Sequence, residues 1–183
     1  SIHIIYEDGT EEFVDSNKTF KTSFGPVVYN HMRQGEVYDA RLEQDGFSEP
    51  DFCDDDWVNA KLIDPPGGIY EKKITPPVKV FEEYTPVKFE NGIYDFGTTM
   101  TGWVKIKVKG EAGREISFSY DDKLNDDGTD LFGYWKFAQL PEEEKIHWRG
   151  SNALAQIEGQ PLAHKDIYIL KGGEEEEWSP SFV

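Results

Sequence analysis

The chain has 183 residues, of which 37% are hydrophobic and 14% aromatic, so it can bury a core and is not expected to be disordered. Its formal net charge of −17 argues against nucleic acid and against an anionic membrane surface as partners, because both require a basic surface. Uncharged partners such as neutral glycans remain open. A single cysteine, Cys53, excludes an intramolecular disulfide framework, and no stretch approaches the roughly 20 apolar residues of a membrane-spanning helix.

The first residues predict a β-hairpin. Residues 2–6 and 10–14 flank an Asp8-Gly9 pair, a dipeptide typical of tight two-residue turns. Because the chain opens inside a strand, we expect neighbouring strands to precede it in a longer protein. The missing signal peptide therefore says nothing about the compartment.

Glu36, Asp39 and Arg41 in the segment GEVYDARLE (35–43) permit two interpretations. Glu36 and Asp39 could be the paired carboxylates that glycosidic hydrolysis requires, with Arg41 as a sugar clamp. Alternatively, Arg41 bridges Asp39 or a neighbouring carboxylate at a structural corner. We favour the corner, because spacing alone does not make a catalytic pair.

Three consecutive carboxylates, Asp54, Asp55 and Asp56, suggest calcium, a hard ion that takes oxygen ligands. The alternative is a short helical turn in which these aspartates cap the N-terminus while Phe52 and Trp57 fill the core. We favour the turn.

Proline and glycine mark a junction further along the chain, in DPPGG (64–68) and TPP (75–77). We therefore predict two domains. Residues 1–75 would be the tail of one β-sandwich module with the junction, and residues 76–183 a second β-sandwich module, truncated at its C-terminus.

The second domain is predicted to consist of strands. Residues 78–81 and 87–89 have strand patterns, and Asn91-Gly92 predicts a turn into residues 93–96. The clearest pattern is at 104–109, where valine and isoleucine alternate with lysine; residues 115–120 alternate in the same way after a glycine-flanked turn. We predict that these last two strands form a hairpin with one apolar face, as in an antiparallel sandwich.

Trp103 precedes the alternating strand and follows Gly102. Strict alternation would place its ring on the lysine side of the strand. We nevertheless expect the ring to be buried, because Gly102 permits a β-bulge that resets the register.

Residues 129–165 have no clear period. An EF-hand at 123–134 is excluded, because Lys123 and Tyr134 occupy loop positions one and twelve, where Asp and Glu are needed. Tyr134 and Trp135 belong to an aromatic run that could stack on a sugar or anchor its own loop to the sandwich. Residues 141–148 are predicted as a short helix, 166–170 as a strand and 174–177 as a solvated charge run.

Common catalytic motifs are missing from the sequence. It contains no glycine-rich phosphate loop, no Cys/His set with zinc spacing and no G-x-S-x-G nucleophile elbow.

Four segments, in this order, resemble the bacterial α-L-rhamnosidases of glycoside hydrolase family 78. They are GEVYDARLE at 35–43, residues 52–57 (family pattern F-D-D-S-x-W), DFG…GWV at 95–104, and DIYILKGG at 166–173 followed by WSPSF at 178–182. The chain departs from the second pattern, with Cys53 and Asp55 where aspartate and serine are usual.

The resemblance implies an all-β, antiparallel β-sandwich of jelly-roll, galactose-binding-like or concanavalin-like type, with parts of two modules. In this family the acid and base of an inverting mechanism lie on a helical barrel, so the resemblance assigns no catalytic residue here and implies an inactive fragment. The implied partners are that barrel and, through the parent enzyme, a rhamnose-containing glycan. No cofactor is implied.

Two other interpretations compete with this one. The chain could be an independent carbohydrate-binding module, with calcium as an optional cofactor, or a complete small enzyme that uses Glu36 and Asp39. We also expect self-association through an open sheet edge. A further strand should follow Val183, and without it the neighbouring strand has unpaired backbone groups along its edge.

Overall fold

The computed structural model describes residues 2–31, 35–64, 67–69, 71, 73–124, 126–128 and 165–181. In these ranges nearly all regular structure is strand, and the only helical segment is the short 3-10 helix η1 (Ala40–Leu42). The predicted all-β class is therefore confirmed. No helix within these ranges is long and apolar enough to cross a membrane.

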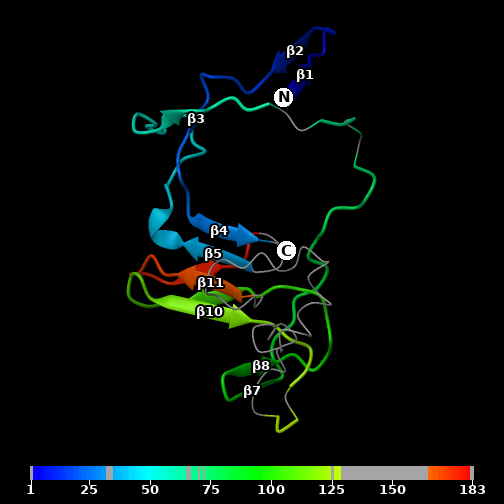
Figure 1. Cartoon of the computed structure of the whole chain (residues 1–183), viewed down its shortest axis with the longest axis vertical. Coiled ribbons are helices and arrows are strands. Elements are labelled where there is room, and N and C mark those ends of the chain that lie inside the picture. Colours follow the sequence, from blue (N-terminus) through cyan, green and yellow to red (C-terminus); the bar gives the residue numbers. More distant parts are fainter. Residues whose placement is uncertain are drawn as a thin grey trace, which may run out of the picture. The chain divides into compact units, whose positions relative to one another are not determined.

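The chain forms two compact units (Figure 1). The first comprises Ser1–Phe24 and Gln44–Lys79, and the second Gly25–Glu43 and Val80–Val183. The second unit thus includes a segment from before the proline-rich junction. The predicted division at residues 75 and 76 stays a prediction.

The first unit contains two antiparallel strand pairs. β1 (Ile2–Ile5) pairs with β2 (Glu11–Val14), and Gly9 adopts a positive φ of 84° in the turn between them. This confirms the predicted N-terminal hairpin. β3 (Lys21–Thr22) pairs with β6 (Val58–Asn59).

A four-stranded mixed sheet forms one layer of the second unit, in the order β10-β11-β5-β4 (Figure 1). The pairs β10–β11 and β4–β5 are antiparallel, whereas β11 and β5 run parallel. A parallel pair cannot be closed by a tight turn, and here it joins segments far apart in the sequence. The strands are β4 (Val27–His31), β5 (Gly35–Asp39), β10 (Glu115–Ser119) and β11 (Lys165–Ile169).

Gly35 is required where β5 begins. Its φ is 88°, and a Cβ atom at this position would lie 2.4 Å from the carbonyl oxygen of Lys165 and 2.6 Å from Oδ1 of Asp166. Any side chain would force β5 and β11 apart, so glycine permits this close approach.

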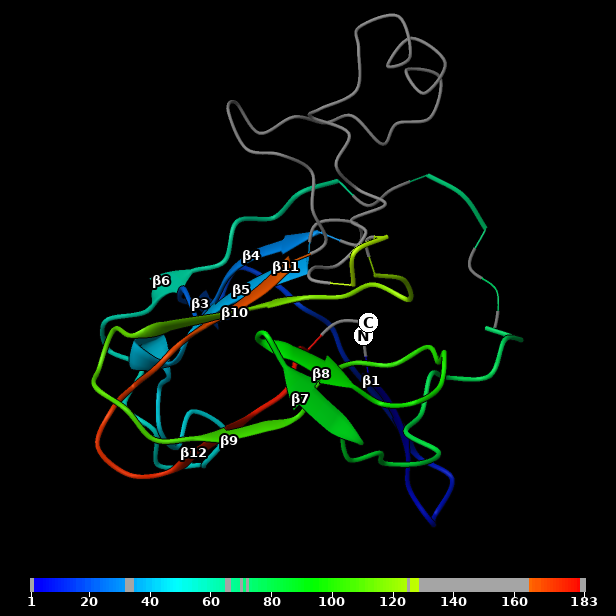
Figure 2. The same ribbon diagram turned by 90° about the horizontal axis from the view of Figure 1, so that it is seen from below.

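A second, two-stranded sheet forms the other layer, where β9 (Ile106–Val108) pairs antiparallel with β12 (Glu176–Trp178) (Figure 2). The predicted hairpin between residues 104–109 and 115–120 is therefore wrong, because β9 pairs with β12 and β10 with β11. The turn at 110–113 carries the chain from one sheet to the other. Alternation gave the correct apolar faces but contains no information about the partner of each strand.

The core lies between these two sheets. It consists of Ala40, Tyr168, Leu170 and Trp178, each at most 6% exposed. The ring of Trp178 stacks on Tyr168 at 5.0 Å between centroids and on Phe118 at 6.0 Å. Apolar residues from both sheets pack around this cluster: Tyr38, Val104, Ile106, Val108, Ile116 and Phe118.

Other predicted elements have mixed outcomes. A hairpin of β7 (Lys88–Glu90) and β8 (Ile93–Asp95) forms around Asn91-Gly92 as predicted, whereas residues 78–81 are not a strand. Trp103 is half-buried, so the expectation of full burial is wrong. Trp178 is the tryptophan that occupies the core. The predicted helix at 141–148 lies outside the described residues.

We predict that Trp178→Ala lowers the free energy of unfolding by about 3–5 kcal/mol, because it empties a large aromatic site in the core. Trp178→Phe should cost less, since it keeps the ring contacts and loses only an indole N–H that has no hydrogen-bond partner among the described residues. Trp103→Ala is the matched control and should cost about 1 kcal/mol. Denaturant unfolding measures all three; an equal loss for the two alanine variants would contradict this view of the core.

Candidate functional site

Two acidic side chains point into the sandwich. Asp166 is in phase with Tyr168 on β11, and Glu36 is in phase with Tyr38 on β5, so strand alternation places both carboxylates on the core side. Glu36 is 1% exposed and Asp166 is 4% exposed. Buried carboxylates are rare and need hydrogen-bond partners.

Both carboxylates have such partners. Oδ1 of Asp166 accepts from the backbone N–H of Glu36 at 2.8 Å, and Oδ2 accepts from the hydroxyl of Tyr120 at 2.7 Å. The Glu36 carboxylate accepts from the backbone N–H of Ser181 at 3.2 Å and 3.3 Å. These bonds connect β5, β11, the residue after β10 and the segment after β12.

Burial shifts the pKa of two members of this cluster, Glu36 and Tyr120. It raises the pKa of Glu36 above 4.5, and the nearby Asp166 carboxylate acts in the same direction, while the hydrogen bonds from Ser181 and Asn30 oppose the shift. Burial and the hydrogen bond to Asp166 also raise the pKa of the Tyr120 hydroxyl, which therefore remains a donor.

A second polar group lies where β5 ends. Asp39 is the N-cap of η1 and accepts from the backbone N–H of Arg41 at 3.1 Å. The Arg41 side chain donates to the same carboxylate through Nε at 2.9 Å and through a terminal nitrogen at 2.7 Å. This two-pronged contact lowers the pKa of Asp39 and confirms the predicted structural corner.

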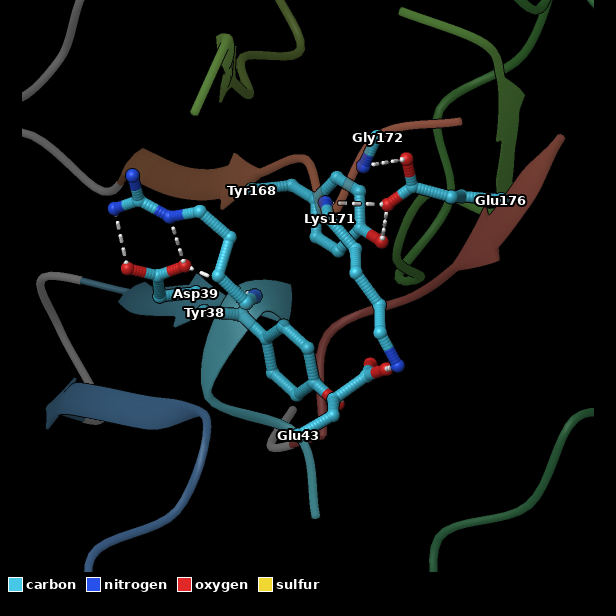
Figure 3. A network of polar contacts seen from close by, with 8 residues as sticks. Tyr38, Asp39, Glu43, Tyr168, Lys171, Gly172 and Glu176 are labelled. Atoms are coloured by element: carbon cyan, nitrogen blue, oxygen red, sulfur yellow. Dashed lines mark hydrogen bonds and ion pairs between the residues drawn. The ribbon is translucent and has the colours of Figure 1, made fainter. Parts of the chain in front are cut away.

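The corner continues into a network of tyrosines and glutamates (Figure 3). Tyr38 donates its hydroxyl to Glu43 at 3.0 Å, and the ammonium of Lys171 lies 3.5 Å from the same carboxylate. Because Tyr38 belongs to β5 and Lys171 follows β11, the Glu43 carboxylate joins the ends of two adjacent strands.

Glu176 closes the turn after β11. Its carboxylate accepts from the Tyr168 hydroxyl at 2.7 Å and from the backbone N–H groups of Lys171 at 2.8 Å and Gly172 at 2.9 Å (Figure 3). Burial acts to raise the pKa of Glu176, but these hydrogen bonds outweigh it and lower the pKa. The predicted solvated charge run at 174–177 is therefore wrong for Glu176, while Glu177 pairs with Lys105 and Lys107.

The candidate catalytic residues do not converge. Glu36 and Asp39 are three positions apart on β5, so they face opposite sides of the strand, one sealed in the core and the other held by Arg41. The sugar-stacking candidates Tyr134 and Trp135 lie outside the described residues.

The aspartate run lies in a hydrogen-bonded turn of the first unit, where the backbone N–H of Trp57 donates to the carbonyl of Asp54 and the Phe52 and Trp57 rings are 5.6 Å apart. The Asp54 carboxylate binds Lys21 at 2.7 Å. The described ranges contain no group of three or more His, Cys, Asp or Glu residues that could hold a metal ion. Calcium binding by Asp54, Asp55 and Asp56 stays a prediction.

Sequence reasoning missed Asp166, Tyr120 and Glu176 as members of these clusters. The signal was present for the first two. Each continues the inward-facing phase of its strand, Asp166 with Tyr168 and Tyr120 with Phe118, and a polar residue at an apolar position indicates a buried polar contact.

The comparisons with known proteins agree with this architecture. The family model for the α-L-rhamnosidase N-terminal domain matches residues 1–82, and the model for the bacterial α-L-rhamnosidase concanavalin-like domain matches residues 86–183. The fold is thus a concanavalin-like β-sandwich preceded by a second β-rich module. The chain belongs to the α-L-rhamnosidase family.

Individual relatives cover nearly the whole chain. It is 32% identical over 182 residues to an α-L-rhamnosidase of Formosa agariphila. Among solved structures, the α-L-rhamnosidase of Streptomyces avermitilis, complexed with L-rhamnose, superposes with a TM-score of 0.76 at 28% identity, and that of Dictyoglumus thermophilum with 0.71 at 31%. These matches cover 97–98% of this chain but only 16–18% of each relative.

We predict that Glu36→Gln becomes more stabilising as the pH rises. Because the folded-state pKa of Glu36 lies above 4.5, the stability that the protonated carboxyl provides is complete below that pH and is lost as pH rises through the folded-state pKa. Glutamine does not titrate and can still accept from Ser181. The difference between the variant and the wild type should therefore shift in favour of the variant as the pH rises from 4.5 to 7.

Asp39→Asn provides the matched control with the opposite sign. The pKa of Asp39 is lowered, so its contribution is present above its usual pKa and is lost as pH falls through the folded-state value. This variant should be the less stable protein at pH 7, by on the order of 1 kcal/mol, and approach the wild type in acid. Denaturant unfolding at several pH values tests both, and a pH-independent difference for Glu36→Gln would refute the raised pKa.

Proposed function

We propose that this chain is the non-catalytic β-sandwich region of an α-L-rhamnosidase and supports a catalytic domain located elsewhere in the same polypeptide. Two rhamnosidase domain models match it in succession, and it covers 16–18% of the three relatives named above. The remaining length of those relatives is where the proposal places the hydrolytic machinery.

The main support for this proposal is that the acidic side chains Glu36, Asp39 and Asp166 of the sandwich are buried or paired and cannot reach a sugar. Glycoside hydrolysis needs two carboxyl groups at the sugar. One protonates the leaving oxygen, and the other either activates the attacking water or attacks the sugar itself. Glu36 and Asp166 are sealed between the sheets, and the Asp39 carboxylate is occupied by Arg41. Glu36 and Asp166 hold strands and neighbouring segments together, and Asp39 caps a 3-10 helix, which suits a supporting role.

The substrate class follows from the relatives. The three proteins named above are all α-L-rhamnosidases, and one of them was solved with L-rhamnose. We therefore propose that the parent enzyme removes rhamnose from glycans. The family resemblance implies inversion, in which one carboxylic acid protonates the leaving oxygen and a separate carboxylate activates water.

The 183-residue chain should not cleave an aryl α-L-rhamnoside above background, whereas the full-length protein should release the aryl alcohol. Colorimetric assays of both at equal molarity make the comparison. Turnover by the chain alone that is lost in Glu36→Gln or Asp39→Asn would establish the competing small-enzyme hypothesis. A full-length protein without rhamnosidase activity would contradict the proposed parent reaction.

Contact with the glycan is the finer part of the proposal. If Tyr134 and Trp135 form a stacking platform, calorimetry should detect weak binding of rhamnose by the chain, reduced about fivefold in Trp135→Ala, since stacking contributes on the order of 1 kcal/mol. Trp148→Ala is the control in the same segment. Binding that instead requires calcium, and is lost when Asp54, Asp55 and Asp56 are changed to asparagine, would favour the calcium-dependent module.

A further inference from the structure

The β7–β8 hairpin of the second unit (Figure 2) has two faces that differ in the side chains they carry. Phe89 and Tyr94 are direct cross-strand partners, with ring centroids 4.4 Å apart, and strand alternation places Val87 on their side. The opposite face carries an ion pair between Lys88 and Glu90. The hairpin is therefore amphipathic, with a compact apolar face formed by Val87, Phe89 and Tyr94.

This apolar face is open to solvent. Phe89 and Tyr94 are each 61% exposed and Val87 is 72% exposed, although Val87 extends the hairpin through a 2.7 Å hydrogen bond from its N–H to the carbonyl of Asp95. A two-stranded hairpin is only marginally stable by itself and needs its apolar side packed against other structure. The opposite face carries the charged residues Lys88, Glu90 and Asp95 together with Ile93, which is already half-buried. The aromatic face is therefore the one whose apolar side chains still require a partner.

The chemistry of the face selects among partners. Two copies of this chain would bring together two net charges of −17, which opposes self-association through this surface. A sugar site needs convergent polar groups that fix the ligand. On this face, however, the two rings pack against each other beside an aliphatic side chain, so it fits an apolar protein surface.

We propose that this aromatic face is the docking surface for the part of the rhamnosidase polypeptide that lies outside these 183 residues. The inference rests on the proposed function, since it takes the chain to be about one sixth of a longer enzyme, as in the relatives of which it covers 16–18%. The docked surface is apolar around the two rings and supplies a hydrogen-bond acceptor for the Tyr94 hydroxyl, because a tyrosine hydroxyl that becomes buried needs such a partner.

Hydrogen exchange tests the location of the surface. Backbone amides of residues 87–96 should exchange at least about tenfold more slowly in the full-length enzyme than in the 183-residue chain, because docking suppresses local opening of the hairpin. Amides of β1 and β2 in the first unit provide an internal reference. Equal exchange of residues 87–96 in the two proteins would overturn the proposal.

A double variant tests the side chains. Phe89→Ser with Tyr94→Ser should lower the midpoint of thermal unfolding of the full-length enzyme by several degrees and remove the extra protection of residues 87–96. Lys88→Ser with Glu90→Ser alters the other face of the same hairpin and should leave both unchanged, since exposed ion pairs contribute little. Equal effects of the two double variants would show that the apolar face has no special role.

Rhamnosidase activity of the full-length protein distinguishes failure of the docking inference from failure of the proposed function. If the full-length protein hydrolyses an aryl rhamnoside but the aromatic variant behaves as the control does, the docking inference fails while the proposed function stands. If the full-length protein has no such activity, the proposed function fails, and the exchange comparison still reports whether the face is covered. Binding of added rhamnose that slows exchange at residues 87–96 in the chain alone would identify the face as a sugar site and overturn the proposal.

Discussion

The sandwich depends on the contact that Trp178 makes across its interior. This residue belongs to β12 in the two-stranded sheet, and its ring stacks on Tyr168 and Phe118, which belong to β11 and β10 in the four-stranded sheet. A single large side chain therefore joins strands of both layers. Because aromatic burial is the largest apolar contribution that one residue can make, the relative position of the two sheets follows from this contact.

Polar groups fix both ends of β5 and β11, the two central strands of the four-stranded sheet. At one end of β5 and β11 the buried carboxylates Glu36 and Asp166 bind backbone and hydroxyl donors from neighbouring segments. At the other end Asp39 and Glu176 cap a 3-10 helix and a tight turn. Hydrogen bonds of this kind add little net stability but have strict geometry, so they specify register where apolar packing alone would tolerate sliding.

The arrangement explains why so many acidic residues in a rhamnosidase chain take no part in our proposed chemistry. Glu36 and Asp166 are buried and accept from backbone N–H groups, so they are excluded from the sugar and from water. The Arg41 guanidinium lowers the pKa of Asp39, so this carboxylate has little tendency to take up a proton. The sandwich is instead suited to hold a fixed shape. On this view its exposed aromatic hairpin provides the remaining requirement, an apolar surface through which a rigid support can contact the domain it supports.

The sequence by itself determined the all-β class, the N-terminal and β7–β8 hairpins, the apolar faces of β9 and β10 and the bridge between Asp39 and Arg41, because alternation and turn chemistry are local properties. The four rhamnosidase segments also identified the family. Only the tertiary structure decided which strands pair, since Val104 to Val108 and Ile116 to Phe118 show the same alternation whether they pair with each other or face each other across a core. It also decided that Trp178 rather than Trp103 is buried, and that Asp166 and Glu176 are structural acids. These outcomes depend on neighbours in other strands and in the facing sheet, and no local pattern in the sequence records such neighbours.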